Sequence, residues 1–157
     1  MALRDELGLP SPIRHPAHEA LLGLVVTAGL LSKEGDRLLR PLGLTDSQFN
    51  VLVLLGFQSK EGALDQSTLG RMLVVNRSNV TGLVDRMERA GRVERAADAS
   101  DRRVKRVRLT AEGRKLLAAA DRRYEARVHE VMGALSERER EMLVRTLEKI
   151  RAALRRR

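Results

Sequence analysis

The sequence predicts a mainly α-helical fold that carries one small β-hairpin. Three observations support this prediction. Apolar residues recur at helical spacing over most of the 157 residues. Capping signals separate the helical stretches from one another. One segment, residues 92–109, instead reads as two short strands around a turn rich in Asp and Ser. The expected order is three or four helices, the hairpin and two further helices.

The composition limits the class of protein. Hydrophobic residues make up 43% of the chain but aromatic residues only 2%, so we expect an aliphatic core. The chain has no cysteine, which excludes disulfides, cysteine-containing metal sites and thiol-based redox sensing. The first residues do not resemble a signal peptide, and the apolar runs are too short to span a bilayer. We therefore expect a soluble cytoplasmic protein with no membrane partner.

Residues 1–43 are predicted to form an N-terminal arm and a long helix. The arm has room for one helical turn at residues 3–7. Pro16 suits the first turn of the helix, and apolar residues recur at helical spacing from Leu21 to Leu38. Pro41 and Gly43 end the helix.

The next segment begins with a strong helix signal. Thr45 and Gln48 form a capping box before an apolar helix. We expect residues 58–64 to form a loop. Asp65 can cap the short helix that follows, and Asn76 can cap the next one after a tight connection at Val74 and Val75.

This second short helix carries an amphipathic pattern. Val80, Leu83, Val84 and Met87 are spaced i, i+3, i+4 and i+7, which predicts one buried stripe. Gly91 suits the left-handed position after the helix. Two short helices with a tight joint make a helix-turn-helix, whose second helix can lie in the major groove of DNA.

Short polar side chains, a glycine and arginines surround the other side of this helix. The residues expected opposite the apolar stripe, with Asn79 and Arg86 flanking them, are Ser78, Thr81, Gly82, Asp85 and Arg89. Arg77 is a predicted phosphate contact, and Arg86 can reach a guanine edge or a phosphate. The alternative is the solvated face of an ordinary helix. The predicted DNA-binding residues of the helix are Arg77, Ser78, Asn79, Thr81, Gly82 and Arg86.

The turn of the hairpin is highly charged. An arginine held out on a hairpin suits a narrow minor groove, where the potential is most negative. We assign the groove insertion to Arg103 and the orienting of its guanidinium to Asp101, with Arg102 either on the DNA backbone or as a substitute for Arg103. Lys105, Arg106 and Arg108 are predicted to add phosphate contacts. The alternative is a solvated turn with local ion pairs.

The net charge of +9 is unevenly distributed. Residues 1–60 hold six basic and six acidic residues, whereas residues 71–114 hold twelve basic and six acidic ones. The excess therefore begins where the helix-and-hairpin pattern begins, which is typical of a protein that binds a polyanion. A generally Arg-rich composition is the alternative explanation.

Residues 110–157 are predicted to form two further helices. Thr110 caps a long helix, and Ser136 with Glu139 forms a second capping box that opens the last one. The apolar stripes at both ends of the chain exceed what a small lobe can cover, which favours dimerisation. We expect a single domain, 1–157, in which the lobe at 44–109 lies between dimerisation helices at 1–43 and 110–157.

The run VVNRSNVTGLVDRMERAGRVERAADASDRRVKRVRLTAEG, residues 74–113, resembles the recognition helix and wing of MarR-type winged helix-turn-helix regulators. Asp101 and Arg103 match the wing tip, and Leu109, Thr110 and Gly113 match the start of the next helix. The resemblance implies a homodimer with interlocked terminal helices, double-stranded DNA with a palindromic site as partner, and repression relieved by a small, often phenolic or lipophilic effector. Effector-binding residues are not distinguishable from core residues.

Other classes of function have weaker support. We find no phosphate loop, nucleophile motif or metal-ligand spacing, so we expect neither an enzyme nor a cofactor. His15 and His18 are a conceivable metal half-site, but with His129 as the only other histidine we predict no metal. An effector-independent architectural or nucleoid-type DNA-binding protein remains the alternative, and a steep salt dependence without sequence preference would favour it.

Overall fold

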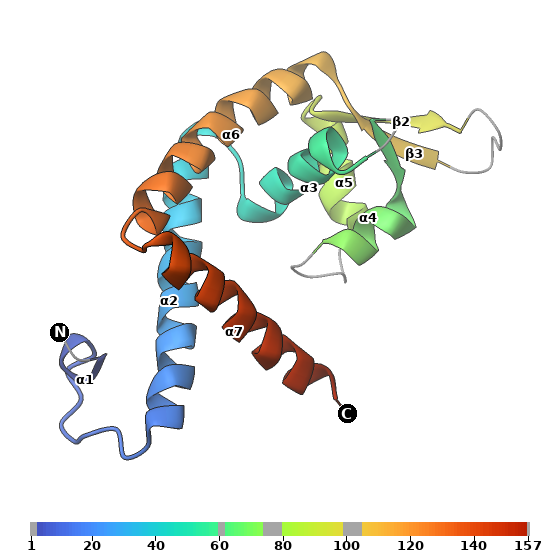
Figure 1. The fold of residues 1–157 in the computed structure, drawn as a ribbon. Helices are drawn as coiled ribbons and strands as arrows, with labels where there is room; N and C mark the ends of the chain where they lie inside the picture. Colours follow the sequence, from blue (N-terminus) through green and yellow to red (C-terminus); the bar gives the residue numbers. More distant parts are fainter. Residues whose placement is uncertain (1–2, 60–61, 74–79, 99–104, 157) are drawn as a thin grey trace. The chain divides into compact units, whose positions relative to one another are not determined.

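The computed structural model describes residues 3–59, 62–73, 80–98 and 105–156. The chain divides into two compact units, residues 1–120 and residues 121–157, and the long helix α6 runs from the first into the second (Figure 1). The helices are α1 (Leu3–Glu6), α2 (Pro16–Leu39), the 3-10 turn η1 (Arg40–Leu42), α3 (Asp46–Phe57), α4 (Gln66–Met72), α5 (Val80–Arg89), α6 (Ala111–Met132) and α7 (Glu137–Arg155). The strands are β1 (Ala63–Asp65), β2 (Val93–Ala97) and β3 (Lys105–Leu109).

The predicted helix starts and ends are confirmed in the first half of the chain. Pro16 lies in the first turn of α2, and Gly43 ends η1 with a φ of 62°, which glycine adopts without strain. Thr45 and Gln48 form both hydrogen bonds of the expected capping box at the start of α3. The predicted helical turn in the arm is α1.

The sheet is the main departure from the sequence prediction. Residues 58–64 were expected to form a loop, but Ala63 and Leu64 belong to β1. The described residues form a three-stranded antiparallel sheet in the order β1-β3-β2. In its register, Leu64 and Arg95 both lie opposite Val107. The expected hairpin is β2 and β3, and its strands project beyond the helices α3 to α5 (Figure 1). The missed strand makes β3 central.

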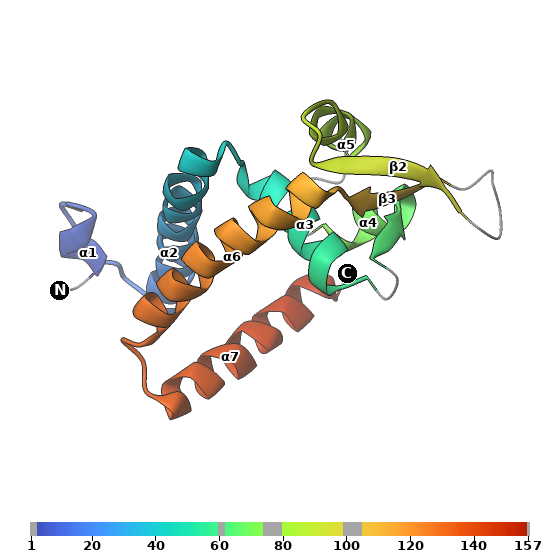
Figure 2. The same ribbon diagram turned by 90° about the horizontal axis from the view of Figure 1, so that it is seen from above.

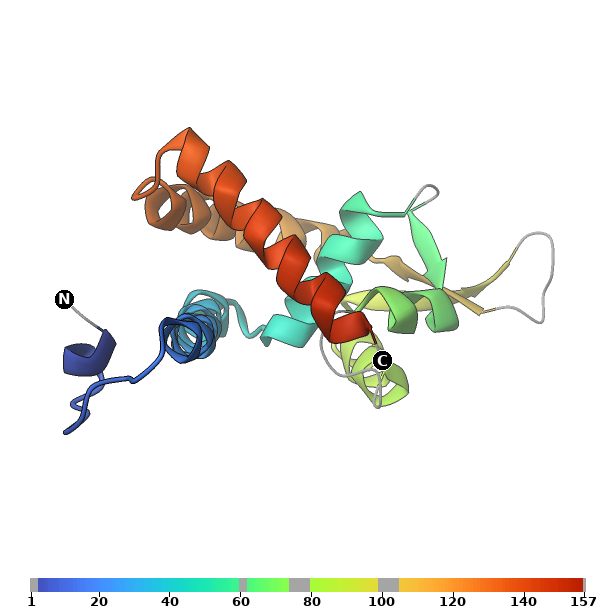
Figure 3. The same ribbon diagram turned by 60° about the horizontal axis from the view of Figure 1, so that its bottom comes forward.

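The helix-turn-helix of the lobe is α4 followed by α5. Asp65 caps α4 as predicted, because its side chain accepts the backbone N–H of Thr68 at 2.8 Å. Figure 3 shows β1 leading directly into α4. After α5, Gly91 adopts the expected left-handed conformation with a φ of 66°. The connection at Val74, Val75 and Asn76 lies outside the described residues.

An aliphatic core joins these elements, as the composition predicts. The predicted stripe of α5 is buried at all four positions, and α3 contributes Phe49 together with aliphatic neighbours. The buried cluster comprises Leu39, Leu44, Phe49, Val51, Leu52, Leu55, Leu69, Leu73, Val80, Leu83, Val84, Met87, Val93, Val107, Leu109, Leu117 and Ala120. Every member belongs to the first unit.

The second unit contains the end of α6 and all of α7. Ser136 and Glu139 form the predicted capping box of α7. Arg140 donates to the backbone carbonyls of Met132 at 3.1 Å and Leu135 at 2.8 Å, and so satisfies acceptors at the C-terminal end of α6. Helix α7 has no buried residue. Among the described residues, we find no helix with the length and apolar character needed to cross a membrane.

Candidate functional site

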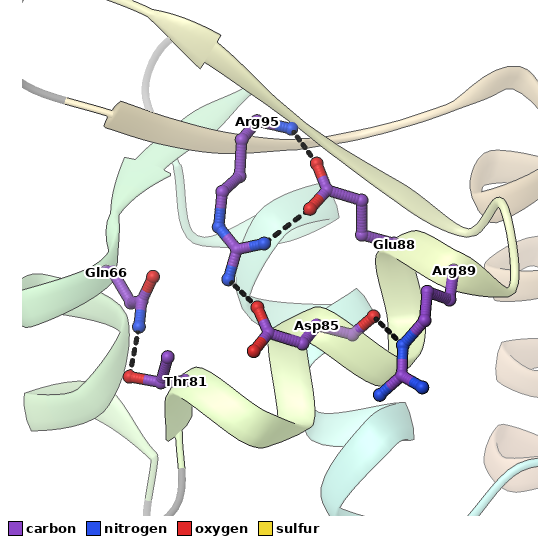
Figure 4. Close-up of polar contacts among 6 residues, drawn as sticks. All are labelled: Gln66, Thr81, Asp85, Glu88, Arg89 and Arg95. Atoms are coloured by element: carbon purple, nitrogen blue, oxygen red, sulfur yellow. Dashed lines mark hydrogen bonds and ion pairs between the residues drawn. The ribbon is translucent and has the colours of Figure 1, made fainter.

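The two helices of the helix-turn-helix are in direct contact. Gln66 Nε2 at the start of α4 donates to Thr81 Oγ1 in the first turn of α5 at 2.6 Å (Figure 4). Farther along α4, a Cβ on Gly70 would lie 3.4 Å from Val80 Cγ2, so the helices approach closely there. An open hollow of about 400 Å³ lies between them and is lined by Gln66, Ser67, Gly70, Arg71, Val80 and Thr81.

Half of the residues predicted on the recognition helix are described. Thr81 and Arg86 are exposed on α5, and Gly82 is half-buried. The Arg86 side chain makes no hydrogen bond or ion pair with another residue in the described ranges. Arg77, Ser78 and Asn79 lie outside the described residues. Helix α5 therefore exposes a hydroxyl in its first turn and an unpaired guanidinium in its last turn, and both groups can contact bases or phosphates.

Asp85 lies opposite the buried stripe, as expected, and its side chain is 46% exposed, but its carboxylate already has a partner within the lobe. Its carboxylate is turned to β2, where Oδ1 accepts from Arg95 Nη2 at 2.5 Å (Figure 4). Glu88, one turn along α5, forms a second ion pair with Arg95 Nη1. The other oxygen of Glu88 accepts the backbone N–H of Arg95 at 2.9 Å. We call Arg95, Asp85 and Glu88 the Arg95 cluster.

The predicted basic residues of the hairpin differ in exposure and in whether they have an internal partner. Lys105 is exposed at the start of β3. Arg106 is half-buried and pairs with the buried carboxylate of Asp98, so part of its charge is used within the lobe. Asp101, Arg102 and Arg103 lie outside the described residues.

Internal partners take up much of the positive charge of this region. Arg108 pairs with Glu94, its cross-strand neighbour, at 2.8 Å. Arg92 donates to Gln48 Oε1 at 3.1 Å and to the carbonyl of Gly43 at 2.9 Å, so it ties the start of β2 to the corner before α3. Among the described residues of the lobe, Arg86 and Lys105 are the exposed cations for which no internal partner is found.

Sequence reasoning missed the Arg95 cluster, although a signal for it exists. Asp85 and Glu88 are three residues apart on one helix, so both can reach one cation beside that helix. Burial disfavours the charged Arg95 side chain, but its hydrogen bonds and charge interactions with Asp85 and Glu88 outweigh this effect. The pKa of Arg95 is therefore raised above its ordinary value.

The two histidines near the start of α2 contact each other. The rings of His15 and His18 lie edge to face with their centroids 5.9 Å apart. Within residues 3–59, 62–73, 80–98 and 105–156, no group of three or more His, Cys, Asp and Glu side chains is arranged to hold a metal ion.

Comparison with known proteins gives consistent matches. A family model described as MarR family matches residues 44–105. The chain is 30% identical over 143 residues to the HTH-type transcriptional regulator FarR of Neisseria gonorrhoeae, a match that covers 88% of this chain and 91% of FarR. It is 38% identical over 98 residues to the transcriptional activatory protein BadR of Rhodopseudomonas palustris. That match covers 62% of this chain and only 56% of BadR.

Solved structures agree with the fold. Sco5413, a MarR family transcriptional regulator from Streptomyces coelicolor, is 31% identical with a TM-score of 0.73, covering 88% of this chain and 95% of Sco5413. Sco3205 from the same organism, solved in complex with DNA, is 26% identical with a TM-score of 0.76, covering 93% of each chain. CouR from Rhodococcus jostii RHA1, solved with p-coumaroyl-CoA, is 28% identical with a TM-score of 0.75, covering 88% of this chain and 95% of CouR.

Proposed function

This chain belongs to the MarR family of transcriptional regulators, and on that premise we propose that it is a homodimeric, sequence-specific repressor of palindromic operators that a small effector releases from DNA. The observation that carries the proposal is a winged helix-turn-helix lobe whose second helix exposes an unpaired arginine and a hydroxyl. The relatives compared are transcriptional regulators, and we propose no enzymatic activity.

Recognition helix α5 is proposed to enter the major groove. Arg86 is the described side chain best suited to a guanine edge, because an arginine can donate two hydrogen bonds to O6 and N7. Thr81 is proposed to contact the DNA while Gln66 holds its hydroxyl at 2.6 Å. Gly82 allows close approach to the DNA, and the sequence adds Arg77, Ser78 and Asn79 to this set.

The hairpin is proposed to reach the flanking minor groove as a wing. Arg103 is assigned to the groove, Asp101 to the orientation of its guanidinium and Arg102 to the backbone. Lys105 is the described residue that supports this reading most directly, because it is exposed next to this segment without a partner among the described residues. Arg106 is proposed as a weaker phosphate contact, since Asp98 already pairs with it.

Dimerisation is proposed to bring two lobes onto one face of the duplex. We assign it to residues 1–43 and 110–157, which flank the lobe at 44–109. Two recognition helices related by a two-fold axis would enter successive major grooves about 34 Å apart, which requires an inverted repeat. An effector that changes the spacing of the two lobes would break several contacts together. CouR bound to p-coumaroyl-CoA supports a small-molecule effector for this chain.

Selection of bound fragments from random-sequence duplex DNA tests the proposal. We expect the selected fragments to share an inverted repeat and to be bound by a dimer. A duplex that contains this repeat is called the selected duplex. A scrambled duplex of the same composition serves as the control. Equal affinity for both, with a steep salt dependence, would reject sequence-specific repression and support the architectural alternative.

A pair of arginine variants tests the reading surface. Arg86→Ala is expected to lower affinity for the selected duplex by about 1–3 kcal/mol and to relax base preference at one position. Arg145→Ala, compared at protein concentrations at which both variants are dimers, is the control, because Arg145 is exposed and its nearest carboxylate, Glu141, is 3.9 Å away. Equal losses from Arg86→Ala and Arg145→Ala would remove Arg86 from the reading surface.

A further inference from the structure

The Arg95 cluster joins the recognition helix to the wing through three charged hydrogen bonds. Arg95 lies in β2 with its side chain 20% exposed, while Asp85 and Glu88 lie on α5 and are 46% and 38% exposed. One guanidinium nitrogen donates to each carboxylate, and Glu88 also accepts the Arg95 backbone N–H at 2.9 Å (Figure 4). The planar guanidinium fork thus fixes direction as well as distance.

The backbone contact has its own consequence for the sheet. Strand β2 is an edge strand, because the order β1-β3-β2 leaves one of its sides without a neighbouring strand. The N–H groups on that side point away from β3 and need other acceptors. Glu88 supplies one, so α5 takes the place of a fourth strand at Arg95. Figure 2 shows α5 lying alongside β2.

The Arg95 cluster links α5 to the hairpin at a distance from the turn that joins them. The chain passes from α5 to β2 through Gly91, whose left-handed conformation sets a sharp turn. Buried Met87 and Val93 anchor the two elements near this turn. Arg95 lies farther along β2, and it is paired with Asp85, which lies farther back along α5. A second anchor at a distance from the turn fixes the angle between helix and strand.

We propose that Arg95 is a positioning residue that holds the wing at a fixed angle to recognition helix α5, so that helix and wing bind DNA as one rigid unit. This inference rests on the proposed function, because it assigns the cluster a role in DNA binding. A wing that is already held in its binding orientation loses little conformational entropy when it enters the minor groove. A mobile wing would lose more, and its affinity for DNA would be lower.

A double-mutant cycle measures this coupling. Arg95→Met removes the guanidinium but keeps an unbranched side chain, and the two half-exposed carboxylates remain in contact with water. We would measure affinity for the selected duplex with and without Arg103→Ala in each background. Arg103→Ala is expected to cost about tenfold or more in the wild-type chain but less than about threefold in the Arg95→Met chain. General loss of fold would lower both affinities without changing this ratio.

Arg108→Met is the matched control for the cycle. It makes the same substitution in the same hairpin, but it breaks the exposed pair with Glu94, which does not involve α5. Arg108→Met can change the affinity for DNA by itself. In the Arg108→Met chain, however, Arg103→Ala should still lower the affinity for the selected duplex about tenfold. Arg95→Lys should restore only part of the coupling, because a single ammonium cannot match the guanidinium fork.

The outcomes separate the two proposals. If Arg103→Ala does not lower the affinity of the wild-type chain for the selected duplex, the wing assignment of the proposed function is wrong. If Arg103→Ala costs the same factor in the wild-type and Arg95→Met chains, the wing binds DNA but Arg95 does not position it, and the inference is wrong. Should Arg95→Met fail to fold, Asp85→Ala decides by the same cycle, since it removes the anchor far from the turn while Glu88 keeps its contacts with Arg95.

Discussion

At the scale of single residues, the lobe depends on a close contact where α6 begins. Thr110 Oγ1 donates to the carbonyl of Gly91 at 2.6 Å, lies 3.1 Å from that of Arg92 and accepts the N–H of Gly113 at 2.9 Å. A Cβ on Gly113 would lie 1.9 Å from the carbonyl oxygen of Arg92. Only glycine fits there without backbone movement, which gives a physical reason for the threonine and glycine at these positions.

Replacing Gly113 tests this contact. Gly113→Ala is expected to lower the free energy of unfolding by at least about 2 kcal/mol, because backbone must move to admit the methyl group. Urea unfolding measures the effect as a lower midpoint with an unchanged slope. Gly35→Ala is the control: it lies inside α2 with its nearest neighbour at 3.8 Å, so alanine should stabilise the helix by up to about 1 kcal/mol. Equal effects of both substitutions would contradict the prediction.

The candidate site could be predicted only in part from the sequence. The exposed positions Thr81 and Arg86 follow from helical spacing around the buried stripe, since a helix fixes which side chains share a face. The ion pair of Asp85 was not predicted, because helical spacing says nothing about a strand that packs beside the helix. Its partner Arg95 comes ten residues later, after a turn, and which side chains meet there depends on how β2 packs against α5.

At the scale of elements, local signals predicted the helices well. The capping boxes at Thr45 and Ser136, the cap at Asp65 and the left-handed Gly91 all depend on neighbouring residues, which a single sequence contains. Strand β1 was missed because it has only three residues and no alternating pattern. Its pairing with β3, more than forty residues away, makes it a strand, and such pairing leaves little local trace.

The cap of α4 gives a pH-dependent prediction. Hydrogen bonds from Thr68, first of all from its side chain, hold the pKa of Asp65 below its ordinary value of 3.8. Because the folded-state pKa is the lower one, the stabilisation is fully present above that ordinary value and is lost as the pH falls through the folded-state pKa. Asp65→Ala should therefore cost about 1 kcal/mol at neutral pH, and less as the pH falls below about 4.

Urea unfolding of both chains between about pH 6 and pH 3 measures this difference. Asp65→Asn is the matched variant, because its amide oxygen can still accept the Thr68 N–H but carries no titrating charge. It should lose less stability than Asp65→Ala at neutral pH. A gap between wild type and Asp65→Ala that stayed constant over this pH range would show that the carboxylate charge contributes nothing to the cap.

At the scale of the whole molecule, the buried core lies in the lobe and the adjoining parts of α2 and α6. Helix α2 contributes Leu39 alone to it, and α7 contributes nothing. Large apolar side chains are exposed on both helices, including Leu21 and Val25 on α2 and Val144 on α7. Exposed apolar surface on this scale is typical of an interface. The sequence predicted this excess from helical stripes, but which residues meet across an interface depends on a second chain.

We predict that the purified chain is a dimer and that a charge in either helix dissociates it. Val25→Asp and Val144→Asp replace side chains that are 62% and 55% exposed, on α2 and α7 respectively. Each would bury an unpaired carboxylate in the interface, once per protomer, which should raise the dissociation constant of the dimer by about a hundredfold or more. Sedimentation over a range of concentrations measures this constant, and affinity for the selected duplex should fall with it.

Phe57→Asp is the matched control for the dimer, because Phe57 is 55% exposed but lies at the end of α3 in the lobe. It should leave the dissociation constant unchanged, since an aspartate that faces water costs little. Loss of DNA affinity through Val25→Asp should be recovered at higher protein concentration, because mass action restores the dimer. A wild-type chain that sediments as a monomer while binding the selected duplex would show that the exposed faces of α2 and α7 serve another purpose.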